Sequence, residues 1–328
     1  MTADTAPAGA PSLRDLVDRL RAGVVGRTRE IELVVAAIAA DRHILIEGPP
    51  GTGKSTLLRG VAREMDIGFE FVEGNAELTP ARLVGHFDPA RVLVDGYVPD
   101  VFVPGPLAAA LTDGALLYIE ELNRVPEETL NVLITVMSER ELHVPRLGRI
   151  EAAPGFRLVS AMNPFDAVGT ARISSAVYDR VCRIAVDYQS ETDELTILRK
   201  EISSSPTRAD REASEVEPAW QLQVVELVRA TREHPDLRIG SSVRGAIDLV
   251  LVANALGELR TAGAHAPSVS LDAALVALSG RVRLREGTDR STEDVIRELF
   301  DTVFGRSVDE GGTDGGKAGA PTGATTSS

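Results

Sequence analysis

The feature that most constrains the fold is an apolar run, a glycine-rich turn and an amphipathic run in direct succession. "HILIE" (43–47) precedes "GPPGTGKST" (48–56), and "LLRGVARE" (57–64) follows. The middle segment satisfies G-x-x-x-x-G-K-[ST], in which backbone N–H groups of a loop turn toward phosphate oxygens at a helix N-terminus. The order strand, loop, helix favours a phosphate-binding loop over a chance glycine-rich turn.

Two side chains of this loop have a defined expected chemistry. Lys54 should reach the terminal phosphates of a nucleoside triphosphate, and the Ser55 hydroxyl should bind Mg²⁺. The residues expected to bind the nucleotide are Gly48, Pro50, Gly51, Thr52, Gly53, Lys54, Ser55 and Thr56.

Five short apolar runs separated by segments long enough for helices predict an α/β fold. This alternation is typical of a parallel five-stranded sheet covered by helices on both faces. Ligands of such open sheets bind at the carboxyl ends of the strands, where polar residues follow the first four runs. The runs are "HILIE" (43–47), "FEFVE" (69–73), "ALLYI" (115–119), "FRLVSA" (156–161) and "VCRIAV" (181–186).

The apolar stretch "LLYIEELNR" (116–124) stops at two adjacent carboxylates, Glu120 and Glu121. Burying an unpaired charge is costly, so acids at the end of a buried strand need a partner. If this strand ends beside the phosphate-binding loop, Glu120 would assist the metal and Glu121 would polarise the attacking water as general base. The alternative is a glutamate pair favoured by the dipole of the next helix.

Two further polar residues fit the same site. "FRLVSAMNP" ends at Asn163, whose amide could orient the attacking water or contact the γ-phosphate; an Asn-Pro turn is the alternative. "RIGSSVRGAIDLV" predicts a helix with Ser241 or Ser242 as its cap and Arg244 in its first turn. A cation there is unfavourable unless an anion compensates it, so Arg244 should face phosphate rather than be an ordinary surface arginine.

Composition excludes some classes of function. The formal net charge of -14 over 328 residues opposes sequence-independent binding to nucleic acid. The chain has no apolar stretch long enough to cross a membrane, and its first eleven residues lack a signal-peptide pattern, so a cytoplasmic location without membrane insertion is expected. Cys182 lies in the apolar run "RVCRIAV" and is expected to be a buried, inert thiol without a role.

Two inserts and a second domain complete the expected organisation. "ARVLVDGYVPDVFV" (90–103) predicts a hairpin turning at Asp95-Gly96, and "ELHVPRLGRIEAA" (141–153) a second hairpin around Gly148. Amphipathic helices are expected at about 218–233 and 242–259. The expected divisions are a flexible N-terminus 1–12, an α/β nucleotide-binding domain 13–190, a linker 191–217, a small all-helical lid domain 218–306 and a disordered tail 307–328.

The motifs together resemble those of AAA+ ATPases. Walker A "GPPGTGKST", Walker B "LLYIEELNR", sensor 1 "SAMNP", the "VYDRVCRI" segment and sensor 2 "GSSVRG" follow in that family's order and spacing. The blocks "VVGRTREIELVVAAIAADRHILIEGPPGTGKS", "ELTPARLVGHFDP" and "NPFDAVGT" are similar to those of the MoxR group. The resemblance runs from about residue 13 to residue 300.

The resemblance implies a ring of identical subunits, usually a hexamer, with ATP and Mg²⁺ between neighbours and an arginine supplied in trans. By position Arg180 is the expected arginine finger, with Arg183 and Arg172 as alternatives. Val25 and Gly26 of the N-terminal block would contact the nucleotide. The inserts would line the pore or touch substrate. MoxR relatives typically remodel, activate or mature a partner complex together with a protein that carries a von Willebrand factor A domain.

The chain departs from the family pattern at two positions. Walker B usually reads Asp-Glu, so Glu120 is one methylene longer at the metal position, which bears on magnesium affinity and hydrolysis rate. Val243 stands where a proline is common. Three other functions remain open: a nucleic-acid motor, a subunit like the magnesium chelatase ATPase, and a weakly hydrolysing nucleotide-gated scaffold. The sequence names neither the client nor the stability of the ring without nucleotide.

Overall fold

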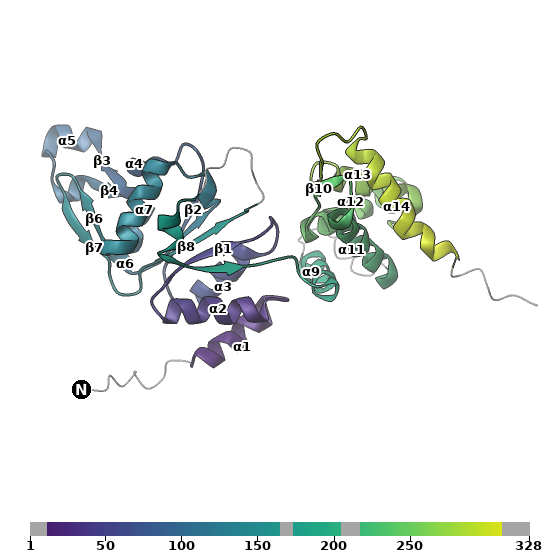
Figure 1. Ribbon diagram of the computed structural model, residues 1–328, viewed down its shortest axis with the longest axis horizontal. Coiled ribbons are helices and arrows are strands. Elements are labelled where there is room, and N and C mark those ends of the chain that lie inside the picture. The colour runs from purple at the N-terminus through teal and green to yellow at the C-terminus, as the bar shows by residue number, and fades with distance from the viewer. Residues whose placement is uncertain (1–11, 165–172, 205–216, 310–328) are drawn as a thin grey trace, which may run out of the picture. The chain divides into compact units, whose positions relative to one another are not determined.

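The protein is described here by a computed structural model that covers residues 12–164, 173–204 and 217–309. The chain divides into two compact units, Met1–Asp193 and Glu194–Ser328. The first unit contains a parallel sheet with helices on both faces, and the second is mainly helical (Figure 1).

The sheet of the first unit has five parallel strands in the order β2-β5-β8-β1-β9. This confirms the predicted parallel five-stranded sheet, and each strand lies within one residue of the apolar run that predicted it. Since β1 pairs with both β8 and β9, the loop after β1 opens near polar residues that follow its neighbours. The strands are β1 (His43–Glu47), β2 (Phe69–Glu73), β5 (Leu116–Glu120), β8 (Arg157–Met162) and β9 (Val181–Ala185).

Alternate side chains of each strand enter two separate apolar cores, as the two-residue period of a strand requires. Ile44 and Ile46 pack with α1 (Leu13–Gly23), α2 (Thr28–Ala39) and α3 (Lys54–Glu64) on one face of the sheet. Leu45 packs into the core on the other face, with α4 (Pro80–Val84), α6 (Pro106–Asp113) and α7 (Glu127–Glu139). Both faces are covered, which explains why β1 is buried along its whole length.

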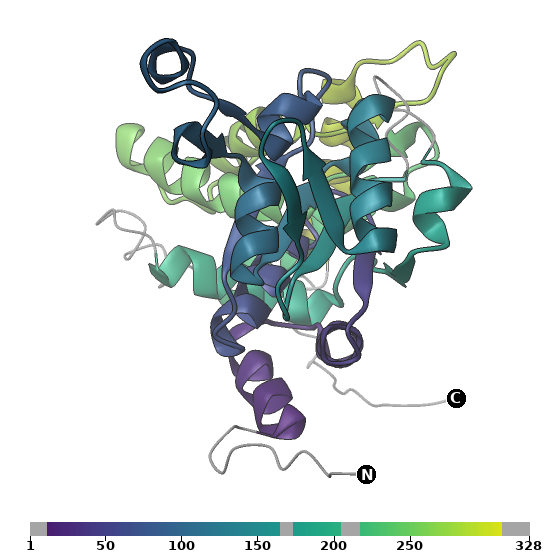
Figure 2. The ribbon, with the colours of Figure 1, turned by 90° about the vertical axis from the view of Figure 1, so that its left-hand side faces the viewer.

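The predicted hairpin turn at Asp95-Gly96 is wrong. Residues Pro89–Asp95 form a short helix, α5, that projects from the first unit (Figures 1 and 2). Asp88 caps this helix by accepting from the N–H groups of Ala90 and Arg91, and Gly96 ends it at a φ of 75°. The cap at Asp88, the proline at the start of the helix and the glycine at its end favour a helix more strongly than Asp95-Gly96 favours a turn. A short antiparallel pair, β3 (Gly85–Phe87) and β4 (Phe102–Pro104), and a 3-10 turn, η1 (Pro99–Val101), frame α5.

The second predicted hairpin is confirmed. β6 (Glu141–Val144) and β7 (Gly148–Glu151) pair antiparallel, with Leu142 opposite Ile150. The connecting turn includes Arg146, and both Arg146 and Gly148 have positive φ values. Two more short elements complete the first unit: η2 (Leu122–Arg124) and α8 (Ser175–Tyr178).

The second unit is mainly helical, as predicted, around a core that includes Trp220, Leu249 and Phe300. Its helices are α11 (Pro218–Glu233), α12 (Val243–Leu259), α13 (Pro267–Leu278) and α14 (Thr292–Asp309), and α9 (Glu191–Ser204) leads into it. A small antiparallel pair, β10 (Leu237–Ile239) and β11 (Arg283–Leu284), was not expected.

Residues 191–204 of the predicted linker are therefore helical. Leu198 and Ile202 of this helix are buried in the apolar core of the second unit. The rest of that linker up to residue 216 and the tail from residue 310 lie outside the described residues. The N-terminal segment 1–11 does as well.

Two smaller expectations have different outcomes. Cys182 is exposed rather than buried, because β9 is an edge strand and this side chain lies outside both apolar cores. Among the described helices, none has the length and apolar character needed to span a lipid bilayer.

His43 generates a testable prediction about stability. Its side chain is 7% exposed and accepts a hydrogen bond at Nδ1 from the backbone N–H of Leu158 at 2.9 Å. Burial, together with the positive charge of Arg140, lowers the pKa of His43 from 6.5 to about 4. The unfolded chain therefore binds this proton at a higher pH than the folded chain, and stability is lost as the pH falls from 6.5 toward 4.

We expect His43→Asn to remove about 2 kcal/mol of the difference in stability between pH 7.5 and pH 5, because asparagine can accept the same bond without titrating. Hydrogen exchange of β1 and β8 peptides, corrected for intrinsic rates, measures this difference for the first unit. Equal pH dependence in the wild type and the variant would contradict the prediction.

Candidate nucleotide-binding site

The glycine-rich loop connects β1 to α3 and needs its glycines for space and conformation. A side chain at Gly48 would place Cβ 2.3 Å from the carbonyl oxygen of Val186, so only glycine fits. Gly51 and Gly53 have φ values of 72° and 80°, and Gly53 is the N-cap of α3. The loop thus leads directly into a helix N-terminus, an arrangement suited to an anion.

Lys54 lies folded over this loop. Its Nζ donates to the carbonyl oxygens of Gly48 at 2.9 Å and Pro49 at 2.7 Å. Thr52 is 1% exposed, and its hydroxyl donates to the Pro49 oxygen at 3.0 Å. The lysine cation is therefore held where the loop would surround phosphate oxygens, which are stronger acceptors for an ammonium group than neutral carbonyls.

Arg27 supports the loop through hydrogen bonds to backbone carbonyls, a role that the sequence did not reveal. Its guanidinium is buried, and Nη2 donates to the carbonyl oxygens of Thr52 at 2.8 Å and Asp187 at 2.6 Å. Glu30 lies 3.4 Å from Nη1, and burial lowers the pKa of Arg27 from its usual value. Arg27 thus joins the middle of the loop to the segment after β9. In the sequence, the one indication that Arg27 belongs to the nucleotide-binding site was its position next to Gly26.

The end of β5 meets the start of α3 at a polar contact. The Ser55 hydroxyl donates to Glu120 Oε1 at 2.8 Å, and the Tyr118 hydroxyl lies 3.1 Å from Ser55 Oγ. Burial raises the pKa of Tyr118 well above its usual value, so the phenol stays protonated beside Ser55 and Glu120. Ser55 and Glu120, the two predicted metal ligands, therefore lie together.

Glu121 follows in a strained conformation. Its φ of 53° and ψ of 47° are left-handed, which costs a non-glycine residue about 1 kcal/mol or more. The side chain pairs with Arg124, with Oε2 and Nε 3.1 Å apart, and is 39% exposed. Gly74, after β2, approaches so closely that a Cβ there would lie 2.5 Å from the Glu121 carbonyl oxygen. This backbone turn directs the second carboxylate away from the strand and keeps it accessible.

Asn163, the predicted sensor, follows β8 and is half-buried. Its carbonyl oxygen accepts from Asn123 Nδ2 at 3.2 Å, which ties it to the turn after Glu121. The structure therefore brings four predicted residues, Ser55, Glu120, Glu121 and Asn163, to the carboxyl ends of adjacent strands beside the loop.

These residues fit a magnesium–nucleotide complex. Mg²⁺ prefers oxygen ligands and is commonly held by one or two protein groups together with substrate phosphates. Ser55 and Glu120 supply a hydroxyl and a carboxylate whose oxygens are 2.8 Å apart. The loop supplies backbone N–H groups and the Lys54 ammonium for phosphate oxygens.

The remaining predicted nucleotide contacts lie around the same loop. Pro50 and Thr56 are exposed, Val25 is half-buried, and Gly26 has a φ of 67°. A Cβ at Gly26 would lie 2.6 Å from the Asp193 carboxyl carbon, which explains the glycine. Arg244 is exposed in the first turn of α12 in the second unit, where Ser242 is the N-cap residue without a side-chain cap bond.

The three candidate trans arginines differ in their surroundings. Arg180 donates to Ser138 Oγ at 2.5 Å and to the Ala176 carbonyl at 2.8 Å, and its side chain is 32% exposed. Arg183 pairs with the buried carboxylate of Glu47, which also accepts from the Tyr178 hydroxyl at 2.7 Å. Burial raises the pKa of Tyr178 to about 12. Arg172 lies outside the described residues.

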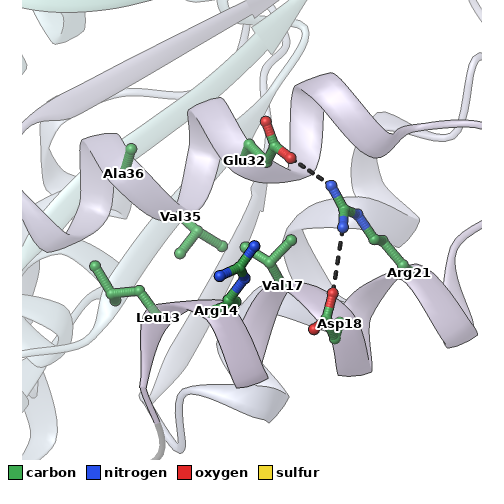
Figure 3. A pocket seen from close by; sticks show the side chains of 8 residues that line it. All are labelled: Leu13, Arg14, Val17, Asp18, Arg21, Glu32, Val35 and Ala36. Carbon is green, nitrogen blue, oxygen red and sulfur yellow. Dashed lines mark hydrogen bonds and ion pairs between the residues drawn. The ribbon is translucent and has the colours of Figure 1, made fainter.

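A separate surface pocket lies between α1 and α2 (Figure 3). Leu13, Val17 and Val35 line it, and Arg21 bridges Asp18 and Glu32 beside it. None of the predicted site residues lines this pocket, so it is distinct from the nucleotide-binding loop.

Comparisons with known proteins agree with this geometry. Residues 43–181 match the AAA domain family, dynein-related subfamily. YeaC of Bacillus subtilis, an uncharacterized protein, is 26% identical over 75% of this chain and 78% of its own length. The gas vesicle ATPase GvpN of Haloferax mediterranei is 30% identical over 61% of this chain and 59% of its own. The chain thus spans less than two thirds of GvpN.

A solved structure supports the fold independently. A protein of Cytophaga hutchinsonii assigned as an ATPase superposes with a TM-score of 0.50 at 22% identity, over 88% of this chain and 92% of that one. At this identity the likeness concerns the fold alone. Residues 43–181, which hold the glycine-rich loop and the contact of Ser55 with Glu120, are thus similar in sequence to AAA domains.

Proposed function

We propose that this chain is a MoxR-type, Mg²⁺-dependent ATPase that works as a ring, usually a hexamer, to remodel, activate or mature a partner complex. The observation that carries the proposal is the contact of Ser55 with Glu120 at 2.8 Å beside the Lys54 loop, with Glu121 and Asn163 at the same edge of the sheet. This arrangement contains each group needed to bind a triphosphate, hold a metal ion and activate water.

Each residue has a proposed role in hydrolysis. The loop amides and Lys54 bind the phosphates, and Ser55 and Glu120 hold Mg²⁺, which neutralises phosphate charge when bound. Glu121 accepts a proton from the attacking water, and its strained backbone holds the carboxylate ready for this step. Asn163 orients the water, and Arg244 contacts phosphate.

The longer acid at position 120 is compatible with hydrolysis. The extra methylene still lets the Glu120 carboxylate reach the Ser55 hydroxyl, and the protonated Tyr118 phenol supports the same hydroxyl. A glutamate at the metal position can therefore share a ligand site with Ser55. This favours an active ATPase over a weakly hydrolysing scaffold.

The ring and its partner are the further parts of the proposal. Arg180, one-third exposed between α8 and β9, is the proposed arginine finger for a neighbouring subunit. The projecting helix α5 exposes Leu93 and Val94, 89% and 84% accessible, which suits contact with a client. A protein with a von Willebrand factor A domain is the proposed partner, and the net charge of -14 disfavours nucleic acid.

The first test removes the proposed general base. We expect Glu121→Gln to lower the ATP turnover number by at least about 100-fold and to change ATP affinity less than about twofold, because the amide cannot accept the water's proton. Phosphate release at saturating ATP and calorimetric binding measure the two quantities.

Glu127→Gln is the matched control, because Glu127 is an exposed acid in the first turn of α7. Its turnover should stay near that of the wild type. If Glu121→Gln keeps wild-type turnover, Glu121 is not the general base.

A second test concerns the support of the loop by Arg27. We expect Arg27→Met to weaken ATP binding by about tenfold, because the Thr52 and Asp187 carbonyls lose a buried donor and the loop loses its preformed shape. Arg27→Lys, which retains a cationic donor, should bind ATP with intermediate affinity. Calorimetry on variants with native circular dichroism measures this. Unchanged affinity in Arg27→Met would show that the loop keeps its shape without this support.

A further inference from the structure

Glu47 is a buried carboxylate immediately before the glycine-rich loop. It is the last residue of β1 and is 4% exposed. Its two oxygens have separate donors: the Tyr178 hydroxyl binds Oε1 at 2.7 Å, and Arg183 Nε binds Oε2 at 2.5 Å. A buried carboxylate is stable only with such partners, so Glu47, α8 and β9 are held to one another.

The proposed arginine finger lies between these two donors. Tyr178 is the last residue of α8, Arg183 lies in β9, and Arg180 is in the short turn that connects them. Arg180 is additionally held by the Ala176 carbonyl at 2.8 Å and by Ser138 Oγ. Glu47 therefore fixes both sides of the turn that carries Arg180.

The same residue is also continuous with the phosphate-binding loop. The Glu47 carbonyl accepts from the Val186 N–H at 2.7 Å, and the next carbonyl, that of Gly48, accepts from Lys54 Nζ at 2.9 Å. A bound triphosphate would compete for Lys54 and release the carbonyls of Gly48 and Pro49. A change at the start of the loop thus reaches Glu47 through one peptide unit.

We infer that Glu47 is a positioning residue that links nucleotide occupancy in one subunit to the placement of the Arg180 that this subunit presents to its neighbour. The inference rests on the proposed function, because it requires a ring in which Arg180 acts in trans. Both Glu47 oxygens accept from residues of α8 and β9, whereas Glu120 Oε1 accepts from Ser55. The defect caused by a Glu47 variant should therefore appear in the neighbouring subunit's ATP site.

Rings that mix two variants can show whether a defect lies in the variant subunit's own ATP site or in the ATP site of its neighbour. Glu47→Gln keeps an acceptor for Tyr178 but removes the charge that binds Arg183, so it should loosen the turn while the subunit's own Lys54 remains. A Lys54→Ala subunit binds ATP too weakly to turn it over, but it keeps Glu47 and Arg180. It also leaves the Gly48 and Pro49 carbonyls without their lysine donor, as a bound triphosphate would. We expect each variant alone to have less than about a fifth of wild-type turnover, with the ATP KM of Glu47→Gln changed less than about twofold.

An equimolar mixture of Glu47→Gln and Lys54→Ala should then hydrolyse ATP at several times the sum of the separate rates. A mixture of Arg180→Ala and Lys54→Ala should recover in the same way. If only the Arg180 mixture recovers, Glu47 acts on its own site and the inference is overturned. If neither recovers, the trans role of Arg180 fails, and the inference fails with it.

Two further variants exclude a general loss of folding. Asp41→Asn makes the same chemical change just before β1, where Asp41 pairs with Arg157 and Arg140, and should keep turnover within about twofold of wild type. Tyr178→Phe removes only one donor to Glu47 and should show a smaller defect that is also rescued by Lys54→Ala subunits. Rescue that is absent for Tyr178→Phe despite a lowered rate would contradict the coupling.

Discussion

The hydrogen bond from Ser55 to Glu120 depends on the whole sheet. Ser55 lies in the first turn of α3, which follows β1, and Glu120 ends β5, yet β8 lies between these two strands. A short hydroxyl can reach the carboxylate only if the three strands run parallel and end level with one another. The registers that place Ile46 beside Ala161 and Ile119 beside Ser160 provide this alignment. The site is thus a direct consequence of strand order and register.

Three residues around this contact each cost folding free energy when taken alone. Glu121 has a left-handed backbone, Arg27 is a buried cation and Glu47 is a buried anion. Two apolar cores on opposite faces of the sheet supply the stability that lets these groups remain ordered. Each buried charge is satisfied by long-range partners: Arg27 by carbonyls near the loop and after β9, and Glu47 by α8 and β9. The unfavourable groups therefore also connect the elements that must act together.

Local patterns in the sequence predicted most of the sheet and the first half of the site. Apolar runs located all five strands, and the spacing from Gly48 to Ser55 located the loop, because both signals depend on neighbouring residues. The α5 insert was misread, since the cap at Asp88 outweighed the turn signal at Asp95-Gly96. Asp187, which binds Arg27, lies 160 positions away along the chain, and Arg183, which binds Glu47, lies 136 positions away. No local pattern indicates such pairs.

The most direct measurement of the central claim is the affinity of ATP for Lys54→Ala, with Lys200→Ala as the control for loss of a lysine in the helix α9. Calorimetric titration of both variants, each checked for native circular dichroism, gives the comparison. The account predicts that Lys54→Ala binds ATP about 100-fold more weakly than the wild type, while Lys200→Ala binds it equally well. Wild-type affinity in folded Lys54→Ala would contradict a triphosphate site in this loop.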